Sequence, residues 1–300
     1  MKLVMTGSES FIGRELKRHC RDRGIGWIGI DTAPSEDAGH VIMDIRAADI
    51  EGAIPWDVDA VVHLAAISRD QDCRSDPRLA VDVNVGGTLN LIRAARARRV
   101  RQFVFASSEW VYGEVGNRDV QTEDSVINAG AILSEYALTK LMGERILSMA
   151  SQRGFCPVTV LRFGIVYGPR PKNWSAVESI FNAIRTEGAV EVKGSLRTAR
   201  RFIHVSDVAD GILSVLGRSG YEVFNLSGNT LISLGDVIEE SAQLLRRQPR
   251  VIERDPAAVS IRNPDNQKAR ARLGWEPTVG LREGLMTLLS EAGEIACRQS

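Results

Sequence analysis

The sequence has no excess of charge of either sign and no long apolar run. Its 38 lysine and arginine residues balance 38 aspartate and glutamate residues, so the chain as a whole has no electrostatic preference for nucleic acid or an anionic membrane. The longest apolar runs, such as Val158 to Leu161 or Ala60 to Ile67 with His63 inside it, are far shorter than the roughly 20 residues that cross a bilayer. We therefore predict no nucleic-acid partner and no membrane association.

A secretory leader and a metal-binding pattern are also missing. The sequence turns polar after its first five residues, MKLVM, whereas a signal peptide needs an apolar stretch of about 7 to 15 residues. A cytoplasmic location is therefore expected. The four cysteines form no CxxC pair, and only His19 lies beside one of them. We expect no metal site and reduced thiols that pack as small apolar residues, at Cys20, Cys73, Cys156 and Cys297.

The chain instead has a regular alternation of short β-rich runs and longer amphipathic ones. This pattern is typical of parallel strands joined by helical crossovers and predicts an α/β fold with a doubly wound parallel sheet, the Rossmann fold. The predicted strands are Lys2 to Met5, Trp27 to Ile30, His40 to Met43, Ala60 to Leu64, Gln102 to Ala106 and Val158 to Arg162. The predicted helices between them are Phe11 to Arg23, Arg78 to Arg98 and Ser134 to Arg153.

The alternation becomes irregular after Gly168, where Pro169 and Pro171 interrupt it. We predict a first domain over residues 1–168, with some return segments near 203–228, and a smaller α/β region mainly over residues 169–300. The predicted elements of this second region are helices near Ser175 to Glu187, Ser206 to Leu216, Leu234 to Leu245 and Leu281 to Ala292, and strands at Val190 to Val192 and Tyr221 to Leu226.

A glycine-containing turn, Thr6 to Gly13, joins the first predicted strand to the first predicted helix. Backbone amides and the positive end of a helix dipole would meet a pyrophosphate at such a turn, although Ser10 occupies the middle glycine position. Asp31 ends the second predicted strand, where a carboxylate can accept hydrogen bonds from ribose hydroxyls and would repel a 2′-phosphate. This favours NAD over NADP; the alternative for Asp31 is an acid that only stabilises a turn.

Tyr136 and Lys140 lie four residues apart in a predicted helix and therefore on one helix face. A nearby ammonium favours the tyrosinate, so the tyrosine could transfer a proton near neutral pH. The fifth predicted strand leads into Ser107 and Ser108 at the edge where doubly wound sheets bind ligands. Ser108 could then bind the same substrate oxygen as Tyr136, the alternative being a helix cap. We take Ser108, Tyr136 and Lys140 as candidate catalytic residues.

These motifs resemble the extended short-chain dehydrogenase/reductase family, in its branch of NAD-dependent nucleotide-sugar epimerases, dehydratases and reductases. Further matching stretches lie along nearly the whole chain: Asp44-Ile45, His63 to Ala66, Asn84 with Gly87-Thr88, Val111 to Gly113, Leu161-Arg162, Val166 to Pro169, Arg200 to Asp207, and Lys268-Ala269 with Leu273 to Trp275. The resemblance implies a homodimer and an NAD site formed by Gly7, Ser10, Phe11, Ile12, Gly13, Asp31, Asp44, Ile45, Leu64, Ala65, Ala66, Asn84, Ser107, Tyr136 and Lys140.

The resemblance also implies a nucleotide-sugar substrate, whose diphosphate suits arginine side chains. Its candidate contacts are Ser108, Glu109, Trp110, Asn173, Arg200 and Arg262. Trp110 stands where dehydratase and decarboxylase relatives carry a glutamate, which disfavours both reactions because an indole cannot accept a proton. Glu109 matches the neighbouring position, where some dehydratases place their acid. Ile165 stands where many epimerases have an asparagine.

The expected activity is an NAD-dependent 4-epimerase that acts by transient oxidation at C4 of a nucleotide-diphosphate hexose. A close alternative is an NAD(P)H-dependent reductase of nucleotide 4-keto sugars, which Ile165 fits at least as well. A remote alternative is a non-catalytic NAD-binding scaffold, against which the complete set of catalytic residues argues. The nucleotide base and the sugar are left open.

Overall fold

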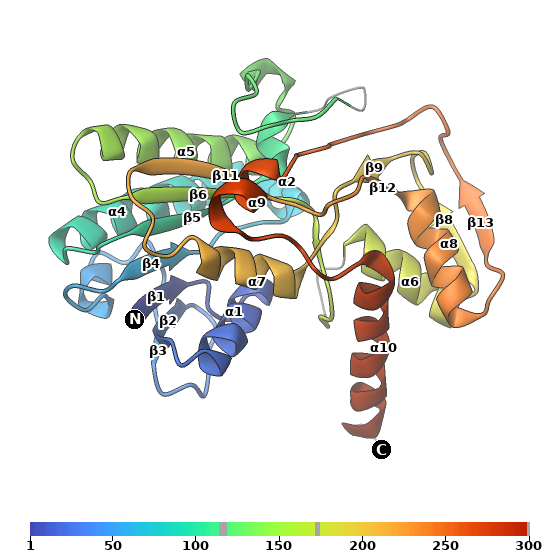
Figure 1. Cartoon of the computed structure of the whole chain (residues 1–300), viewed down its shortest axis with the longest axis horizontal. Helices are drawn as coiled ribbons and strands as arrows, with labels where there is room; N and C mark the ends of the chain where they lie inside the picture. The colour runs from blue at the N-terminus through green and yellow to red at the C-terminus, as the bar shows by residue number, and fades with distance from the viewer. Residues whose placement is uncertain (114–118, 172–174, 299–300) are drawn as a thin grey trace.

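Seven parallel strands form one sheet in the computed structural model, which describes residues 1–113, 119–171 and 175–298, with side chains as far as residue 289. The strand order is β11-β6-β5-β4-β1-β2-β3 (Figure 1). This confirms the doubly wound parallel sheet. The strands are β1 (Lys2–Thr6), β2 (Gly26–Asp31), β3 (His40–Ile42), β4 (Ala60–His63), β5 (Phe103–Ser108), β6 (Val158–Phe163) and β11 (Tyr221–Leu226).

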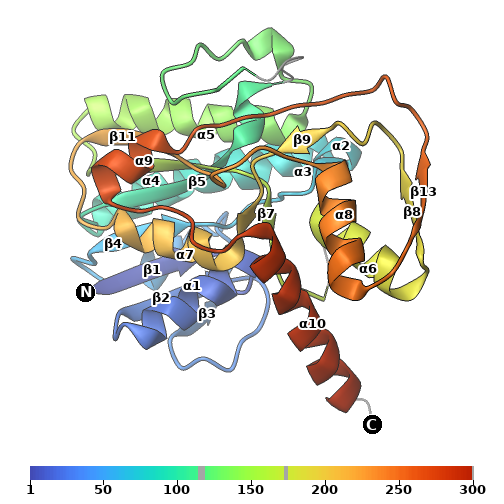
Figure 2. The ribbon, with the colours of Figure 1, turned by 45° about the vertical axis from the view of Figure 1, so that its right-hand side comes forward.

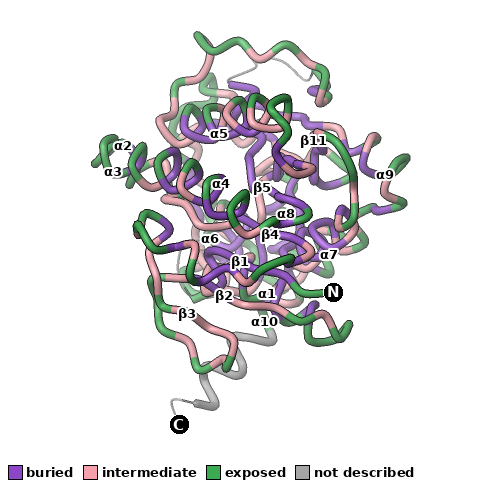
Figure 3. Tube along the Cα trace, turned by 90° about the vertical axis from the view of Figure 1, so that its left-hand side faces the viewer, coloured by how far each residue is buried: buried purple, intermediate pink, exposed green. Residues whose placement is uncertain are grey.

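Helices cover both faces of the sheet. α1 (Phe11–Asp22) and α7 (Val205–Ser214) lie on one face, and α4 (Gly87–Ala97) and α5 (Glu135–Gln152) lie on the other (Figures 1 and 2). Successive side chains of a strand point to opposite faces. Leu3 and Met5 therefore pack with α1 and α7, whereas Val4 packs with α4 and α5. A sheet that is covered on both sides leaves almost no strand position exposed, and every residue of β5 and β6 is buried. Figure 3 shows the buried centre of the sheet around β5.

Two elements differ from the simple alternation in the sequence. The sheet has a seventh strand, because β11 pairs in parallel with β6 after the chain has left the sheet at residue 163. The predicted helix over Arg78 to Arg98 consists of α3 (Pro77–Val81), a π-helical segment (Asp82–Gly86) and α4. A π-helical turn shifts the helix face by one residue, which helical spacing alone does not reveal.

The two faces of the sheet each pack into an apolar core. A third apolar core lies beside the sheet and is formed by later parts of the chain. Its helices are α6 (Ala176–Thr186), α8 (Leu234–Leu245) and α10 (Leu281–Arg298), and β8 (Ala189–Val192) pairs with β13 (Arg250–Glu253). Two short strand pairs connect it to the sheet region: β7 (Val166–Tyr167) with β10 (Ile203–His204), and β9 (Ala199–Arg200) with β12 (Ile232–Ser233). The short helices are α2 (Asp70–Ser75) and α9 (Gln267–Leu273). In the described parts of the chain, no helix combines the length and apolar character that crossing a membrane requires.

A buried ion pair joins three elements beneath the carboxyl end of the sheet. Arg162 of β6 donates from Nε and Nη2 to the two carboxylate oxygens of Glu144 in α5, at 3.0 and 2.8 Å. The Ser107 hydroxyl of β5 donates to the same carboxylate at 2.5 Å. Both charged side chains are almost completely buried. The network therefore fixes α5 against the ends of β5 and β6.

Replacing Arg162 with methionine should strongly destabilise the protein, because the Glu144 carboxylate then lies buried without its countercharge. Removing one partner of a buried pair typically costs about 3–5 kcal/mol of unfolding free energy, which chemical denaturation measures. The control is Arg254→Met, which breaks an equally bidentate but exposed pair with Glu191 and should change stability little. Equal effects of the two substitutions would contradict this account.

Candidate functional site

A cavity of 1390 Å³ opens at the carboxyl ends of the parallel strands. The segments that follow β1, β2, β4, β5 and β6 all contribute to its lining, as expected for ligand binding in a doubly wound sheet. Pockets for one small molecule usually measure about 300–1,000 Å³. The cavity is therefore large enough for a dinucleotide together with a substrate.

The glycine turn at one side of the cavity depends on close backbone packing. Gly7 has φ +71°, and a Cβ there would lie 2.6 Å from the amide nitrogen of Ala65. A Cβ at Gly13 would overlap the Gly7 carbonyl oxygen. Ser10 instead has φ −68° and caps α1, its Oγ accepting the Gly13 N–H at 3.1 Å. The middle position therefore needs no glycine, and Ser10 does not break the motif.

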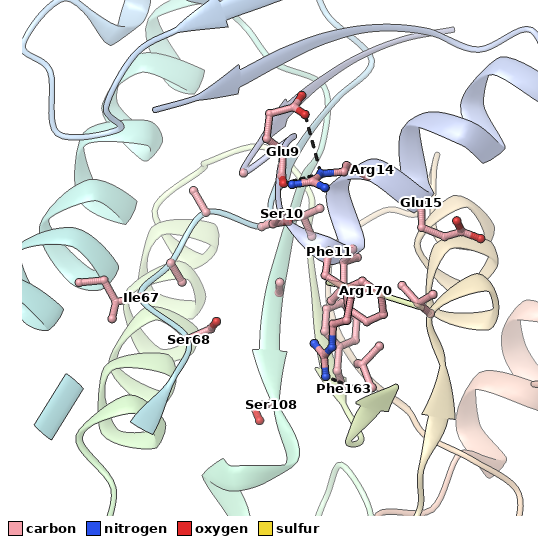
Figure 4. Close-up of a pocket in the computed structure, with 18 of the residues that line it drawn as sticks. Glu9, Ser10, Phe11, Arg14, Glu15, Ile67, Ser68, Ser108, Phe163 and Arg170 are labelled. Carbon is pink, nitrogen blue, oxygen red and sulfur yellow. Dashed lines mark hydrogen bonds and ion pairs between the residues drawn. The ribbon is translucent and has the colours of Figure 1, made fainter. Parts of the chain in front are cut away.

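The N-terminus of α1 faces the cavity through Phe11 and Ile12. Helix geometry leaves the first backbone amides without partners inside the helix, and with the helix dipole they suit a pyrophosphate. The Arg170 guanidinium lies against the Phe11 ring (Figure 4), 4.3 Å from its centre. The Nε of Arg170 is 3.0 Å from the Glu178 carboxylate. The sequence does not indicate Arg170 as a site residue, because only the folded chain brings the segment after β7 to α1.

Asp31 takes the turn-stabilising role that the sequence left open and keeps acceptor capacity for the other one. Its carboxylate accepts the backbone N–H groups of Glu9 and Ala33, both at 2.9 Å, and so stabilises the turn. Each carboxylate oxygen can accept a further hydrogen bond, which leaves capacity for ribose hydroxyls. Asp44 also lines the cavity. Hydrogen bonds from Arg46, at 3.0 and 2.6 Å, keep the pKa of the Asp44 carboxyl below its usual value.

The other predicted cofactor contacts divide into two groups. Ile45, Leu64, Ala65, Ala66 and Ser107 line the cavity. Gly13 and Asn84 do not line the cavity but support residues that do. Asn84 accepts the backbone N–H of Ile67 at 2.8 Å and donates to Thr139 Oγ1 at 3.0 Å, which ties the segment after β4 to α5.

The structure brings the three candidate catalytic residues together in this cavity. Ser108 ends β5, and Tyr136 and Lys140 project from the first turns of α5. Burial raises the pKa of Tyr136 to about 12, and a hydrogen bond with Ser108 acts in the opposite direction. Burial lowers the pKa of Lys140 to about 8, and its Nζ lies 5.8 Å from the centre of the Tyr136 ring. At neutral pH Lys140 is therefore still mainly charged beside the tyrosine.

Trp110 fills the space beside the tyrosine. It lines the cavity, and its ring meets the Tyr136 ring edge to face with the centres 6.4 Å apart. The Arg262 guanidinium lies 4.4 Å from the Trp110 ring centre on another side, a cation–π contact. An aromatic wall therefore stands next to the reacting position.

The remaining predicted substrate contacts lie behind this wall. Glu109 is completely buried, and Arg200 and Arg262 approach its Oε1 at 3.6 and 3.9 Å. Arg200 also donates to the carbonyl oxygen and hydroxyl of Ser260, at 2.6 and 2.8 Å. None of these three charged residues is among those that line the cavity. The predicted contact Asn173 lies outside the described residues.

The sequence profile of the NAD dependent epimerase/dehydratase family matches residues 3–227. The chain belongs to this family. It is 30% identical to a UDP-glucuronate 4-epimerase of Thermodesulfobacterium geofontis over 77% of this chain and 71% of that protein. It is 28% identical to UDP-glucuronic acid decarboxylase 1 of Arabidopsis thaliana over 97% of this chain and 69% of that protein. The structure of MoeE5 in complex with UDP-glucuronic acid and NAD is similar, with a TM-score of 0.87, 28% identity, and coverage of 98% and 100% of the two chains.

The family membership confirms the predicted resemblance and NAD as the cofactor of an oxidoreductase-type enzyme. The residues of the cavity fit this cofactor. The turn at Gly7 admits a close backbone approach, α1 offers its N-terminal amides, and the Asp31 carboxylate retains acceptor capacity. When bound, NAD would supply the redox chemistry, and the chain would orient it.

Replacing Gly7 with alanine should abolish NAD binding, because the added methyl group would collide with the backbone of Ala65. We expect an affinity loss of at least about 100-fold in calorimetric titration with NAD, equivalent to about 2.8 kcal/mol. Gly24→Ala is the matched control, since Gly24 also has a positive φ, +62°, but a methyl group there would meet no atom within 4 Å. A similar loss of NAD affinity in both variants would assign the effect to backbone strain instead.

Proposed function

We propose that the protein is an NAD-dependent 4-epimerase of a nucleotide-diphosphate hexose, with UDP as the favoured nucleotide. The observation that carries the proposal is the presence of Ser108, Tyr136 and Lys140 in the same cavity as the NAD turn. The names of the relatives support it, since they include a UDP-glucuronate 4-epimerase and a UDP-glucose 4-epimerase of Mycolicibacterium smegmatis, 29% identical.

The proposed chemistry is confined to one carbinol carbon. Tyr136 takes the proton of the sugar C4 hydroxyl, and Ser108 holds the same oxygen by a hydrogen bond. NAD, held by the turn at Gly7 and the N-terminus of α1, would supply the hydride acceptor for C4 and the hydride that returns to the opposite face of the sugar. Tyr136 then gives the proton back, so the reaction has no net change of oxidation state. Lys140 Nζ lies 5.8 Å from the centre of the Tyr136 ring, and a positive charge at that position would favour the tyrosinate.

Trp110 argues against decarboxylation and dehydration, although decarboxylases are among the relatives. Those reactions need an acid or base beyond C4, and Trp110 places an indole ring against Tyr136 at the relevant position. The neighbouring carboxylate of Glu109 is fully buried and faces arginines. A 4-keto-sugar reductase remains the second candidate, because Ile165 lines the cavity where many epimerases carry an asparagine.

We also propose that the two parts of the chain bind different ligands. Residues 1–168, together with β11, hold NAD, and residues 169–300 mainly hold the nucleotide sugar. Arg200 and Arg262 belong to the second part, and both approach the Glu109 carboxylate. Arg262 also makes the cation–π contact with Trp110, which follows Glu109 in the chain. Reorientation of these guanidinium groups toward the cavity would provide the diphosphate contacts.

Replacing Tyr136 with phenylalanine should lower turnover by about 10²–10⁴-fold, the usual contribution of a general acid or base. The assay follows interconversion of UDP-glucose and UDP-galactose without added cofactor, and NAD affinity, which should be retained, is the control. An epimerase needs no added NADH, whereas consumption of NADH with a 4-keto sugar would support the reductase. Wild-type turnover in the variant would contradict the role of Tyr136.

We further propose that α4 and α5 form a homodimer interface. α5 exposes Leu138, Met142 and Met149 on the face opposite Tyr136, and Leu89 of α4 is also exposed. Apolar residues at such helical spacing form a stripe that favours packing against another helix. The resemblance to dimeric family members points to a second copy of this chain as the partner.

The double substitution Leu138→Glu and Met142→Glu should convert the dimer to a monomer, because it buries charges in the interface. Light scattering after size-exclusion chromatography measures the mass. Met286→Glu, an equally exposed methionine in α10, is the control and should leave the dimer intact. A wild-type protein that is monomeric at micromolar concentration would overturn this proposal.

A further inference from the structure

We propose that the sugar end of the cavity selects a neutral hexose and rejects a hexuronic acid, because Asp70 places a carboxylate there. The inference rests on the proposed function, since it concerns the sugar of the same nucleotide substrate. It concerns a property that the relatives leave open, because they include both glucose and glucuronate enzymes.

Asp70 is held at the end of the cavity that contains Tyr136. It is the first residue of α2 and lines the cavity. The hydroxyl of Ser134 donates to its Oδ1 at 2.5 Å. Ser134 is the N-cap of α5, two residues before Tyr136. The carboxylate is therefore anchored to the helix that carries the proposed proton-transfer group.

The charges around Asp70 do not create a site for an anion. Arg74 binds the other carboxylate oxygen at 2.8 Å from an exposed position. Arg74 is not among the lining residues, and neither is the exposed Arg69. Asp72 and Glu135 are two further carboxylates that, with Asp70, raise the pKa of the buried Cys73 thiol, and Arg74 also approaches Glu135 at 4.0 Å. Of these charged residues, Asp70 is the one that lines the cavity.

Among the positively charged side chains of the described lining, Lys140 lies at this end of the cavity and the others lie elsewhere. Lys140 lies beside Tyr136 and is buried over the Phe105 ring. The other basic lining residues belong to α1, to the segment after β3 and to the segment after β7. These segments surround the proposed cofactor site, and the residues are Arg14, Arg18, Arg46 and Arg170.

A sugar can carry a hydroxymethyl group or a carboxylate at C6, and the Asp70 carboxylate would interact differently with these two groups. A sugar hydroxyl can donate a hydrogen bond to Asp70, and hydrogen bonds to charged acceptors are stronger than neutral ones. A uronate instead brings a like charge into a partly desolvated cavity, where repulsion is weakly screened. Asp70 therefore favours UDP-glucose-type sugars over UDP-glucuronate.

The test compares binding of UDP-glucose and UDP-glucuronate to the NAD-loaded protein by calorimetric titration. Wild type should bind UDP-glucose at least about tenfold more tightly, a ratio equivalent to about 1.4 kcal/mol. Asp70→Asn should narrow this ratio by strengthening UDP-glucuronate binding, because the amide keeps an acceptor oxygen for Ser134 but lacks the charge. Asp72→Asn is the matched control, since it removes the same charge from an exposed position of α2 outside the lining.

Three results would overturn the inference. Equal affinity for both nucleotide sugars, or tighter binding of UDP-glucuronate, would show that Asp70 does not select against the acid. An equal change of the ratio in Asp70→Asn and Asp72→Asn would assign the effect to general surface charge. In these cases the proposed epimerase activity would stand, whereas failure to bind either nucleotide sugar would overturn the proposed function as well.

Discussion

The ion pair between Glu144 and Arg162 is the interaction on which the geometry of the site depends. It is buried, bidentate and shared with the Ser107 hydroxyl. Ser107 precedes Ser108, and Glu144 lies one helical turn beyond Lys140 on the same face of α5. A single carboxylate thus sets the position of the strand end relative to the helix. Such a pair contributes little net stability compared with apolar packing, and its main effect is to specify one arrangement.

Part of this arrangement can be predicted from the sequence because it is local. Strand and helix periodicity indicates the doubly wound sheet, and a separation of four residues places Tyr136 and Lys140 on one helix face. The carboxyl end of β5 places Ser108 at the ligand-binding edge of a parallel sheet. Ser10 shows how a local pattern can look incomplete and still be functional, because its φ of −68° requires no glycine.

The rest could not be predicted, because it depends on contacts between segments far apart in the chain. Arg170 packs against Phe11 in the lining of the cavity, and Asp70 is held in position by Ser134. Nothing in the neighbouring residues of either distinguishes it from a surface charge. Glu109 shows the opposite case: it follows a strand end that faces the cavity, yet its side chain is buried toward Arg200 and Arg262, because the backbone turns into a 3₁₀ segment there.

Burial acts in opposite directions on the pKa values of the two titratable candidate catalytic groups. It raises the pKa of Tyr136 to about 12 and lowers that of Lys140 to about 8, so the phenol resists ionisation whereas the lysine is still mainly charged at neutral pH. Forming the tyrosinate therefore requires positive charge close by, and Lys140 supplies only one such charge. Trp110 packs edge to face against Tyr136 and, as an indole, adds no competing acid there. In the proposed mechanism, the charge of an oxidised nicotinamide would add to that of Lys140 and so favour the tyrosinate when the cofactor is ready to accept a hydride.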